Sequence, residues 1–244
     1  QIKGQIRFDK VHFTYPDTKI KAINNLSFSI DAGETLAIIG KTGSGKSSIL
    51  DLITRLYDPD SGTVYIDEQD VSKVNLSDLR SQIGYVTQEA FLFSDSIRNN
   101  IRFGRLSASD NDIIEAAKIA DLHNNISSFA KGYDTLLGER GVTLSGGQKQ
   151  RMSIARSVVK NPTILLLDDC LSAVDTKTEE RILRRLKPII QAKTTIIVSH
   201  RISSIKNADH ILVVEDGTVV QSGKHKDLVN STGYYQLIYM EQHP

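Results

Sequence analysis

The stretch TLAIIGKTGSGKSSILDLITRL, residues 35–56, contains the features that decide the fold of this chain. It begins with a continuous apolar run that stops at Gly40, which predicts a buried strand. A glycine-rich loop follows directly. The segment KSSILDLITRL after it predicts a helix that ends before Asp58 and Pro59. The stretch therefore predicts a strand, a loop and a helix in direct succession.

Other segments repeat this alternation of strands and helices. Residues 6–30 alternate between apolar and polar positions, which predicts two half-buried antiparallel strands. Further strands are predicted in GTVYID (62–67), IGYVTQ (83–88), TILLLDD (163–169), TTIIVSH (194–200) and HILVVEDG (210–217). Buried strands that alternate with helical material predict an α/β fold with a mostly parallel sheet and an antiparallel β lobe on its N-terminal side.

Residues 89–160 differ in character from the rest. Ser109 precedes an amphipathic segment and predicts a capped helix. The segment SGGQKQRMSIARSVVKN predicts a second helix, stopped by Pro162. We therefore expect one compact unit over residues 1–244, with a core and β lobe in 1–88 and 161–244 and a helical lobe inserted at 89–160.

The composition is that of an ordinary globular domain. The 244 residues are 39% hydrophobic and 24% charged, and the formal net charge is +1, so we expect no nucleic-acid partner. The single cysteine, Cys170, excludes an internal disulfide and suits a reducing compartment. The chain opens without Met or a leader, and its longest strongly apolar run is Ile164–Leu167. We expect a soluble piece of a longer protein, with any membrane part elsewhere.

The loop GKTGSGKS fits the phosphate-binding pattern G-x-x-x-x-G-K-[ST]. Its glycines let successive backbone N–H groups point at phosphate oxygens, and the following helix adds its positive end. We expect Lys46 to reach the β- and γ-phosphates and the Ser47 hydroxyl to bind Mg²⁺. The alternative is a glycine-rich turn with a solvated lysine. The predicted nucleotide-binding residues of this loop are Gly40, Lys41, Thr42, Gly43, Ser44, Gly45, Lys46, Ser47 and Ser48.

Two further motifs carry candidate chemistry. The strand ILLLDD ends in Asp168, placed to hold a metal ion, and Asp169, placed to orient or deprotonate water. The motif LSGGQ begins a helix that Ser145 caps, and its glycines leave N–H groups for a second anion. The two phosphate sites could serve one nucleotide from different molecules or within one fold, and the residues alone leave both alternatives open.

The motifs GKTGSGKS, LSGGQKQR, ILLLDD, SAVD (172–175) and SH (199–200), in this order, resemble the nucleotide-binding domain of the ABC transporter family. The resemblance covers essentially the whole chain. It implies a P-loop NTPase fold, ATP as substrate, Mg²⁺ as cofactor and a head-to-tail dimer. In that dimer each ATP lies between one P-loop and the partner's LSGGQ, so the residues expected to contact the partner's nucleotide are Ser145, Gly146, Gly147, Gln148 and Asp175.

The resemblance assigns roles to four more positions. Tyr15 resembles the aromatic residue that stacks on adenine, and a tyrosine at a strand end is its structural alternative. Gln88 resembles the glutamine that contacts Mg²⁺ and the attacking water. His200 resembles the histidine that bonds the γ-phosphate. The expected catalytic residues are then Asp169, His200, Gln88 and Lys46, and the expected metal ligands are Ser47, Gln88 and Asp168.

Two features refine the expected class. GERG (138–141) resembles a segment of exporters, which implies a transmembrane domain in the same polypeptide and a place at the cytoplasmic face of the membrane. Position 169 departs from the family pattern, because most active members have Glu there. A carboxylate shorter by about 1.5 Å predicts a poor hydrolytic site. With an intact LSGGQ, this resembles one half of a heterodimeric exporter, whose partner is a different half-transporter.

Two other functions compete with an ATP-driven exporter. The domain could be an ATP-gated clamp with almost no turnover, which Asp169 favours. A soluble ABC ATPase of DNA repair or translation is the second alternative. Such proteins usually separate their motifs with coiled coils or join two cassettes in one chain, and neither feature occurs in this sequence.

Overall fold

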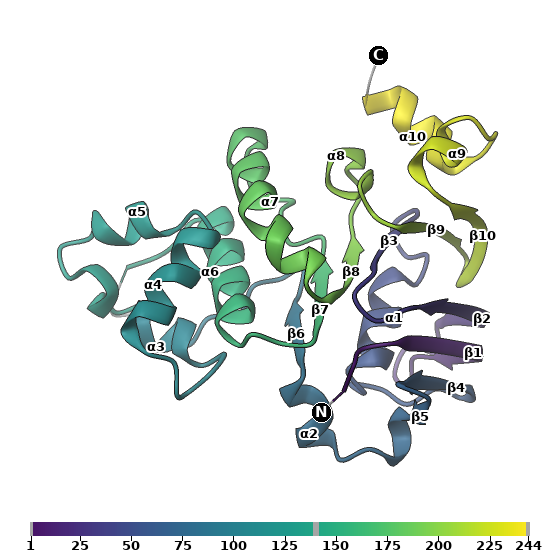
Figure 1. Ribbon diagram of the computed structural model, residues 1–244, viewed down its shortest axis with the longest axis horizontal. Coiled ribbons are helices and arrows are strands. Elements are labelled where there is room, and N and C mark those ends of the chain that lie inside the picture. Colours follow the sequence, from purple (N-terminus) through teal and green to yellow (C-terminus); the bar gives the residue numbers. More distant parts are fainter. Residues whose placement is uncertain (1, 139–141, 243–244) are drawn as a thin grey trace. The chain divides into compact units, whose positions relative to one another are not determined.

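The computed structural model describes residues 2–138 and 142–242. These residues form two compact units, each of which is assembled from separate segments of the chain. Unit 1 contains residues 1–83, 163–168 and 190–244, and unit 2 contains residues 84–162 and 169–189. Figure 1 labels the elements of both units.

The first sheet of unit 1 is antiparallel, with the strand order β2-β1-β4-β5. Its strands are β1 (Ile6–Thr14), β2 (Lys21–Ile30), β4 (Ser61–Ile66) and β5 (Gln69–Asp70). The pairing of Ile6 with Ile30 and of Phe8 with Phe28 fixes the register of β1 on β2. Alternate side chains of β1 are buried, so the prediction of two half-buried antiparallel strands is confirmed.

The second sheet is mostly parallel and carries the residues of interest at one edge. Within unit 1 its strands follow the order β10-β9-β3-β8-β7. Strand β3 pairs in parallel with β8 and β9, β7 pairs in parallel with β8, and β10 pairs antiparallel to β9. Their bounds are β3 (Thr35–Ile39), β7 (Ile164–Asp168), β8 (Thr194–Val198), β9 (His210–Glu215) and β10 (Thr218–Gly223).

Every residue of β3, β7 and β8 is buried, as expected for central parallel strands. The predicted α/β class is therefore confirmed. Strand β6 (Ile83–Val86) begins at the last residue of the first segment of unit 1. The remaining helical elements of unit 1 are a 3₁₀ turn (Val71–Lys73), α2 (Leu76–Ser81), α8 (Ile202–Ile205), α9 (His225–Val229) and α10 (Tyr234–Gln242).

Helix α1 (Lys46–Ile53) ends earlier than the sequence pattern predicts. Arg55 adopts a left-handed conformation with φ of 50°, and the N–H of Leu56 donates to the carbonyl of Asp51 at 2.8 Å. This bond closes the helix end in the manner of a Schellman motif. The expectation that the helix runs through Leu56 to the Asp58-Pro59 stop was therefore wrong by three residues.

Unit 2 is largely helical. Its elements are α3 (Ile97–Arg102), α4 (Asp110–Ile119), α5 (His123–Ser127), a 3₁₀ turn (Gly132–Asp134), α6 (Gly146–Val159) and α7 (Thr176–Gln191). Helix α6 packs on α3 and α4, and its Met152 and Ile154 are buried. The predicted cap at Ser109 is present, and its hydroxyl accepts from the N–H of Asp112 at 3.2 Å. None of the helices in the described ranges has both the length and the apolar character needed to cross a bilayer.

Candidate functional site

The loop between β3 and α1 approaches other backbone so closely that two of its positions require glycine. A Cβ atom on Gly40 would lie 2.1 Å from the carbonyl oxygen of Val214. Gly45 has φ of 98°, and a Cβ there would lie 2.3 Å from the carbonyl oxygen of Ala22. Both distances are shorter than any non-bonded contact, so this path of the loop is open only to glycine at these positions.

Lys46 is buried at the start of α1, although lysine is seldom buried without partners. Its Nζ atom donates to the carbonyl oxygens of Gly40 at 2.9 Å and Lys41 at 2.7 Å, and lies 3.5 Å from the Ser44 hydroxyl. The ammonium group is therefore held inside the curl of the loop. Phosphate oxygens that enter the loop would meet this charge directly.

The N-terminus of α1 offers its N–H groups to a ligand. Gly45 occupies the N-cap position, and within the described part of the chain no side chain caps this helix. The first turn, KSSI, carries no acidic residue that would repel an anion. A glycine-rich loop, an uncapped helix start and a buried lysine together fit a di- or triphosphate.

Three sequence-predicted residues lie at the same edge of the parallel sheet. Ile38 of β3 is in register with Val198 of β8, which in turn is in register with Asp168 of β7. Gly40 and His200 each follow two residues later on adjacent parallel strands. The carboxyl ends of the strands therefore bring the P-loop, Asp168 and His200 together, and this edge is where ligands bind in open α/β sheets.

The donors at this edge fit a magnesium ion. Asp168 is buried at the last position of β7, and Ser47 is half-buried in the first turn of α1, which packs on β7. Carboxylate and hydroxyl oxygens are ligands that Mg²⁺ prefers, and the ion usually takes its other ligands from phosphate and water.

Tyr15 lies beside the P-loop helix, as its predicted role requires. Its hydroxyl is 2.8 Å from the hydroxyl of Ser48 in α1, and its ring contacts Phe13 and Tyr57 edge-on. The ring is only half-buried, and burial raises the pKa of its hydroxyl above the usual value. A neutral aromatic ring next to the P-loop can stack on a nucleotide base.

The C-terminal helix supports the His200 loop, which the sequence analysis did not predict. The Gln242 side chain of α10 donates to the carbonyl oxygen of His200 at 2.7 Å and accepts from the N–H of Ile202 at 2.8 Å. Ile202 is the first residue of α8, so the amide of Gln242 caps that helix from a distance. A lone glutamine 40 residues away offers no sequence signal for this contact.

The signature motif LSGGQ begins α6 in unit 2, and its N-terminus is capped by its own residues. The Ser145 hydroxyl accepts from the N–H of Gln148 at 3.3 Å. The Gln148 side chain accepts from the N–H of Ser145 at 2.9 Å. This reciprocal pair is a capping box, and the predicted cap at Ser145 is therefore confirmed.

Gln150 ties the signature helix to the segment SAVD and was missed by the sequence analysis. Its side chain is buried, accepts from the N–H of Ala173 at 3.0 Å and lies 3.1 Å from the hydroxyl of Ser172. A Cβ on Gly147 would lie 2.9 Å from the carbonyl oxygen of Ala173, so the two segments touch. The sequence feature that could have identified Gln150 is its polar side chain within the buried face of α6.

Asp175, at the end of SAVD, caps the start of α7. Its carboxylate accepts from the N–H of Thr178 at 3.0 Å, and this hydrogen bond lowers the pKa of Asp175 below its ordinary value. Unit 2 thus places Asp175 and the signature glycines on segments joined through Ala173.

The two remaining predicted residues also belong to unit 2. Gln88 is exposed, and its carbonyl oxygen lies 3.5 Å from the Gln150 amide. Asp169 has a left-handed backbone with φ of 41°. This region tolerates aspartate better than most residues that are not glycine. The predicted roles of these two residues stay predictions. Of the exporter-like segment GERG, positions 139–141 lie outside the described residues.

A family model described as ABC transporter matches residues 23–172 of the chain, which is more than half of it. The chain therefore belongs to the ABC transporter family, as the resemblance of its motifs predicted. It is an ATP-binding domain of that family, and such domains are ATPases. ATP is accordingly the nucleotide that domains of this family use.

Two individual members of the family are similar to this chain over nearly its whole length. It is 47% identical over 239 residues to "ATP-binding cassette sub-family B member 6" of Xenopus tropicalis, covering 98% of this chain and 28% of the relative. It is 48% identical over 239 residues to the "Uncharacterized ABC transporter ATP-binding protein YknU" of Bacillus subtilis (strain 168), covering 98% and 41%.

A solved structure of an ABC exporter also resembles this chain closely. The "Structure of a bacterial Atm1-family ABC exporter with ATP bound" matches with a TM-score of 0.94 and 43% identity, covering 99% of this chain and 42% of that one. The chain therefore spans less than half the length of the relatives that it matches.

Proposed function

We propose that this chain hydrolyses Mg-ATP to drive export of a substrate through a transmembrane domain of the same polypeptide, at the cytoplasmic face of a membrane. The observation that carries the proposal is the uncapped start of α1 with buried Lys46 inside the glycine loop. Similarity to an Atm1-family exporter supports the direction of transport.

The proposed reaction is in-line attack of water on the γ-phosphate. Lys46 and His200 stabilise the negative charge that develops on the phosphate oxygens, and Asp169 or a partner's glutamate polarises the water. Ser47, Asp168 and Gln88 are the residues that would hold Mg²⁺, which would neutralise phosphate charge when bound. The N–H groups of residues 40–48 bind the triphosphate, with Tyr15 on the adenine ring.

The proposed active form is a head-to-tail dimer with a second ABC domain. The signature residues Ser145 to Gln148 and Asp175 lie on joined segments of unit 2, which suits a single surface that meets the nucleotide of a partner. Two phosphate-binding helix starts in one chain support this form, because each nucleotide then receives one of each kind.

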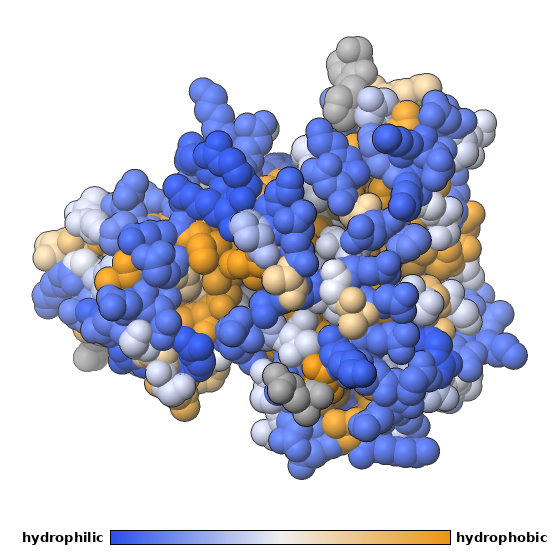
Figure 2. Space-filling model, in the orientation of Figure 1, coloured by the Kyte–Doolittle hydropathy of each residue, from blue (hydrophilic) through white to orange (hydrophobic). Residues whose placement is uncertain are grey.

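An apolar surface on unit 2 suits contact with the transmembrane domain. Phe91 and Phe103 expose 68% and 57% of their surface, and both rings pack against Phe93. A cavity of about 480 Å³ adjoins them, lined by residues of the 90–93 and 142–144 segments. Figure 2 shows further apolar side chains gathered in the region of α6. Exposed aromatic clusters of this kind mark interaction surfaces.

The decisive experiment compares ATP with inorganic triphosphate. The purified protein that carries this chain should bind and hydrolyse Mg-ATP. Tyr15→Ala should weaken ATP binding roughly tenfold, because base stacking contributes about 1–3 kcal/mol. Binding of triphosphate should stay nearly unchanged. Equal losses for both ligands would show that Tyr15 is structural, and absence of nucleotide binding by the wild type would refute the proposal.

Asp169 favours a second candidate, in which this half is an ATP-gated clamp and a different half-transporter supplies the efficient site. If the short carboxylate limits turnover, Asp169→Glu should raise single-turnover hydrolysis by about tenfold. Because a left-handed backbone suits aspartate better, the variant should also lose up to about 1 kcal/mol of stability.

Asp169→Asn is the matched variant for this test, since it keeps the size and removes the charge. Little change in hydrolysis is expected, because little catalysis is lost. A large loss of hydrolysis in Asp169→Asn without a gain in Asp169→Glu would show that Asp169 is a competent base. The hypotheses of an ATP-gated clamp and of a different half-transporter as partner would then lose their support.

A further inference from the structure

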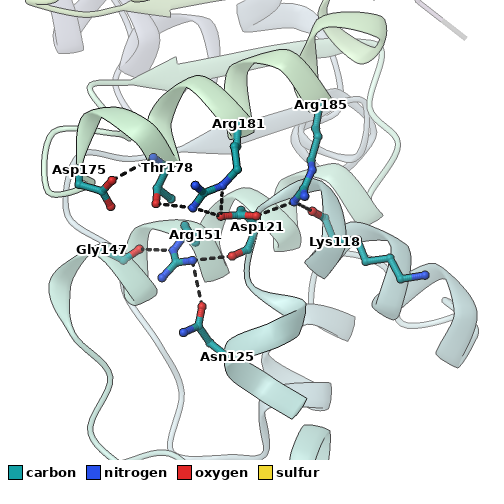
Figure 3. A network of polar contacts seen from close by, with 9 residues as sticks. All are labelled: Lys118, Asp121, Asn125, Gly147, Arg151, Asp175, Thr178, Arg181 and Arg185. Carbon is teal, nitrogen blue, oxygen red and sulfur yellow. Dashed lines mark hydrogen bonds and ion pairs between the residues drawn. The ribbon is translucent and has the colours of Figure 1, made fainter. Parts of the chain in front are cut away.

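Asp121, which lies outside the family motifs, joins two helices of unit 2 through ion pairs. It follows α4 and has a left-handed backbone with φ of 54°, the conformation that ends many helices. Figure 3 shows its carboxylate between Arg181 and Arg185 of α7. The carboxylate accepts from Arg181 at 2.9 and 3.0 Å and from Arg185 at 2.7 Å.

The network reaches the signature helix on one side. Arg151 of α6 donates to the carbonyl oxygen of Asp121, to the side-chain oxygen of Asn125 at 3.1 Å and to the carbonyl oxygen of Gly147 at 3.3 Å. Burial lowers the pKa of Arg151, yet arginine keeps its proton. One guanidinium group thus connects a signature glycine to the residue at the end of α4.

On the other side the network reaches Asp175. Arg181 donates to the hydroxyl of Thr178 at 2.8 Å, and the N–H of Thr178 donates to the Asp175 carboxylate at 3.0 Å. Arg185 also donates to the carbonyl oxygen of Lys118, in the last turn of α4, at 2.6 Å. A continuous chain of contacts therefore runs from Gly147 to Asp175 through Asp121 (Figure 3).

Asp121 carries the negative charge that holds the arginines of this network in place. Two guanidinium groups, those of Arg181 and Arg185, pair with one carboxylate, and a third, that of Arg151, bonds the backbone carbonyl oxygen of the same residue. The Asp121 side chain is only 14% exposed, while those of Arg181 and Arg185 are 44% and 41% exposed. Without the negative charge, Arg181 and Arg185 would face each other with only neutral oxygens between them, so α7 would lose the ion pairs that join it to the end of α4.

We propose that Asp121 is a positioning residue for the surface that acts on a partner's nucleotide. Its carboxylate holds α7 on the end of α4 and so fixes Asp175 relative to Gly147. This inference rests on the proposed function, because it assigns no contact with nucleotide to Asp121 itself. It predicts that Asp121 affects turnover in the assembled protein and leaves ATP binding to the P-loop unchanged.

The test uses Asp121→Asn in the protein that carries this chain. Asparagine tolerates the left-handed backbone at a helix end, so the variant removes the charge and keeps the turn. We expect kcat for ATP to fall about tenfold, in line with the cost of misplacing a catalytic surface by about 1 Å. The affinity for a fluorescent ATP analogue should stay within about twofold. Asp134→Asn is the matched control, since Asp134 pairs with Arg98 at 2.9 Å in the same unit and should change neither quantity.

Arg181→Gln removes the Asp121–Arg181 ion pair from its other side. Because Arg181 is more exposed than Asp121, this variant is expected to fold normally. It should lower kcat, and the double variant should lose no more than Asp121→Asn alone, because Arg181→Gln removes an ion pair that Asp121→Asn has already removed. Wild-type kcat in both single variants, or equal falls in kcat and in nucleotide affinity, would overturn the proposal. If Lys46→Ala leaves nucleotide binding intact, the proposed function itself fails, and this inference fails with it.

Discussion

Helices α1 and α6 both begin at glycine-rich motifs, yet their N-termini are built in opposite ways. Gly45 leaves the start of α1 without a side-chain cap among the described residues, and Lys46 supplies a positive charge there. At α6 the N–H of Gln148 is already bonded to Ser145, and the first turn, GGQK, adds a lysine but no acidic residue. The start of α1 leaves its N–H groups open to an anion, whereas the start of α6 already has one N–H bonded by its own cap.

The contrast between the two helix starts explains why serine suits the N-cap position of α6. A serine hydroxyl can accept from a backbone N–H and donate its own proton to an incoming phosphate. Aspartate would cap α6 equally well but would repel phosphate. The open start of α1 therefore suits a nucleotide held by the chain itself, and the capped start of α6 suits one that arrives with a partner.

Removal of the charge at α1 should have the largest effect. Lys46→Ala should reduce Mg-ATP turnover by about 10²–10³-fold or more, because the ammonium group that faces the phosphates is lost. Lys41→Ala is the matched control, since it removes only an exposed side chain of the same loop and keeps the backbone N–H that the loop offers to phosphate, so most activity should remain. Steady-state ATPase assays and calorimetric titration with ATP measure both variants. Similar losses of turnover in the two variants would mean that any substitution in the loop impairs activity. The Lys46 ammonium group would then have no particular role.

Substitution of Ser145 separates capping from phosphate binding at α6. Ser145→Asp should preserve thermal stability, because aspartate is an equally good N-cap, and should reduce turnover of the assembled protein at least tenfold. Ser145→Ala should cost about 1 kcal/mol of stability and also lose the hydroxyl donor. Thermal unfolding and ATPase rates distinguish the two. Full activity in Ser145→Asp would exclude contact between this helix start and phosphate.

The start of α7 provides a third and smaller test, because its cap is a carboxylate. The hydrogen bond from Thr178 lowers the pKa of Asp175, so this group stabilises the fold above its unfolded pKa. The contribution is lost as pH falls through the lower, folded pKa. Asp175→Asn should therefore have a slightly lower Tm, by about 1–2 °C, at pH 7. That difference should shrink as the pH is lowered below the unfolded pKa of aspartate, as measured by thermal unfolding at several pH values. A difference that persists unchanged at acid pH would exclude the charge as its cause.

Local patterns were sufficient for much of the fold. Alternation in residues 6–30 predicted β1 and β2, and the continuous apolar runs predicted β3, β7 and β8. Strand β10 was missed, because residues 218–223 mix apolar and polar side chains without a clear period and none of them is fully buried. The end of α1 was misplaced because Arg55, a good helix former, adopts a left-handed conformation in which its guanidinium reaches the carbonyl oxygens of Val71 and Val74.

The sequence by itself determined the phosphate loop, the capped signature helix and the family, because each depends on neighbours a few residues apart. Only the tertiary structure decided that Gln242 holds the His200 loop, that Gln150 holds SAVD, and that Asp121 joins α4 to α7. These contacts join positions 23 to 64 residues apart. Such a side chain finds its partner only after packing has brought the two elements together, so spacing along the chain carries no trace of the pair.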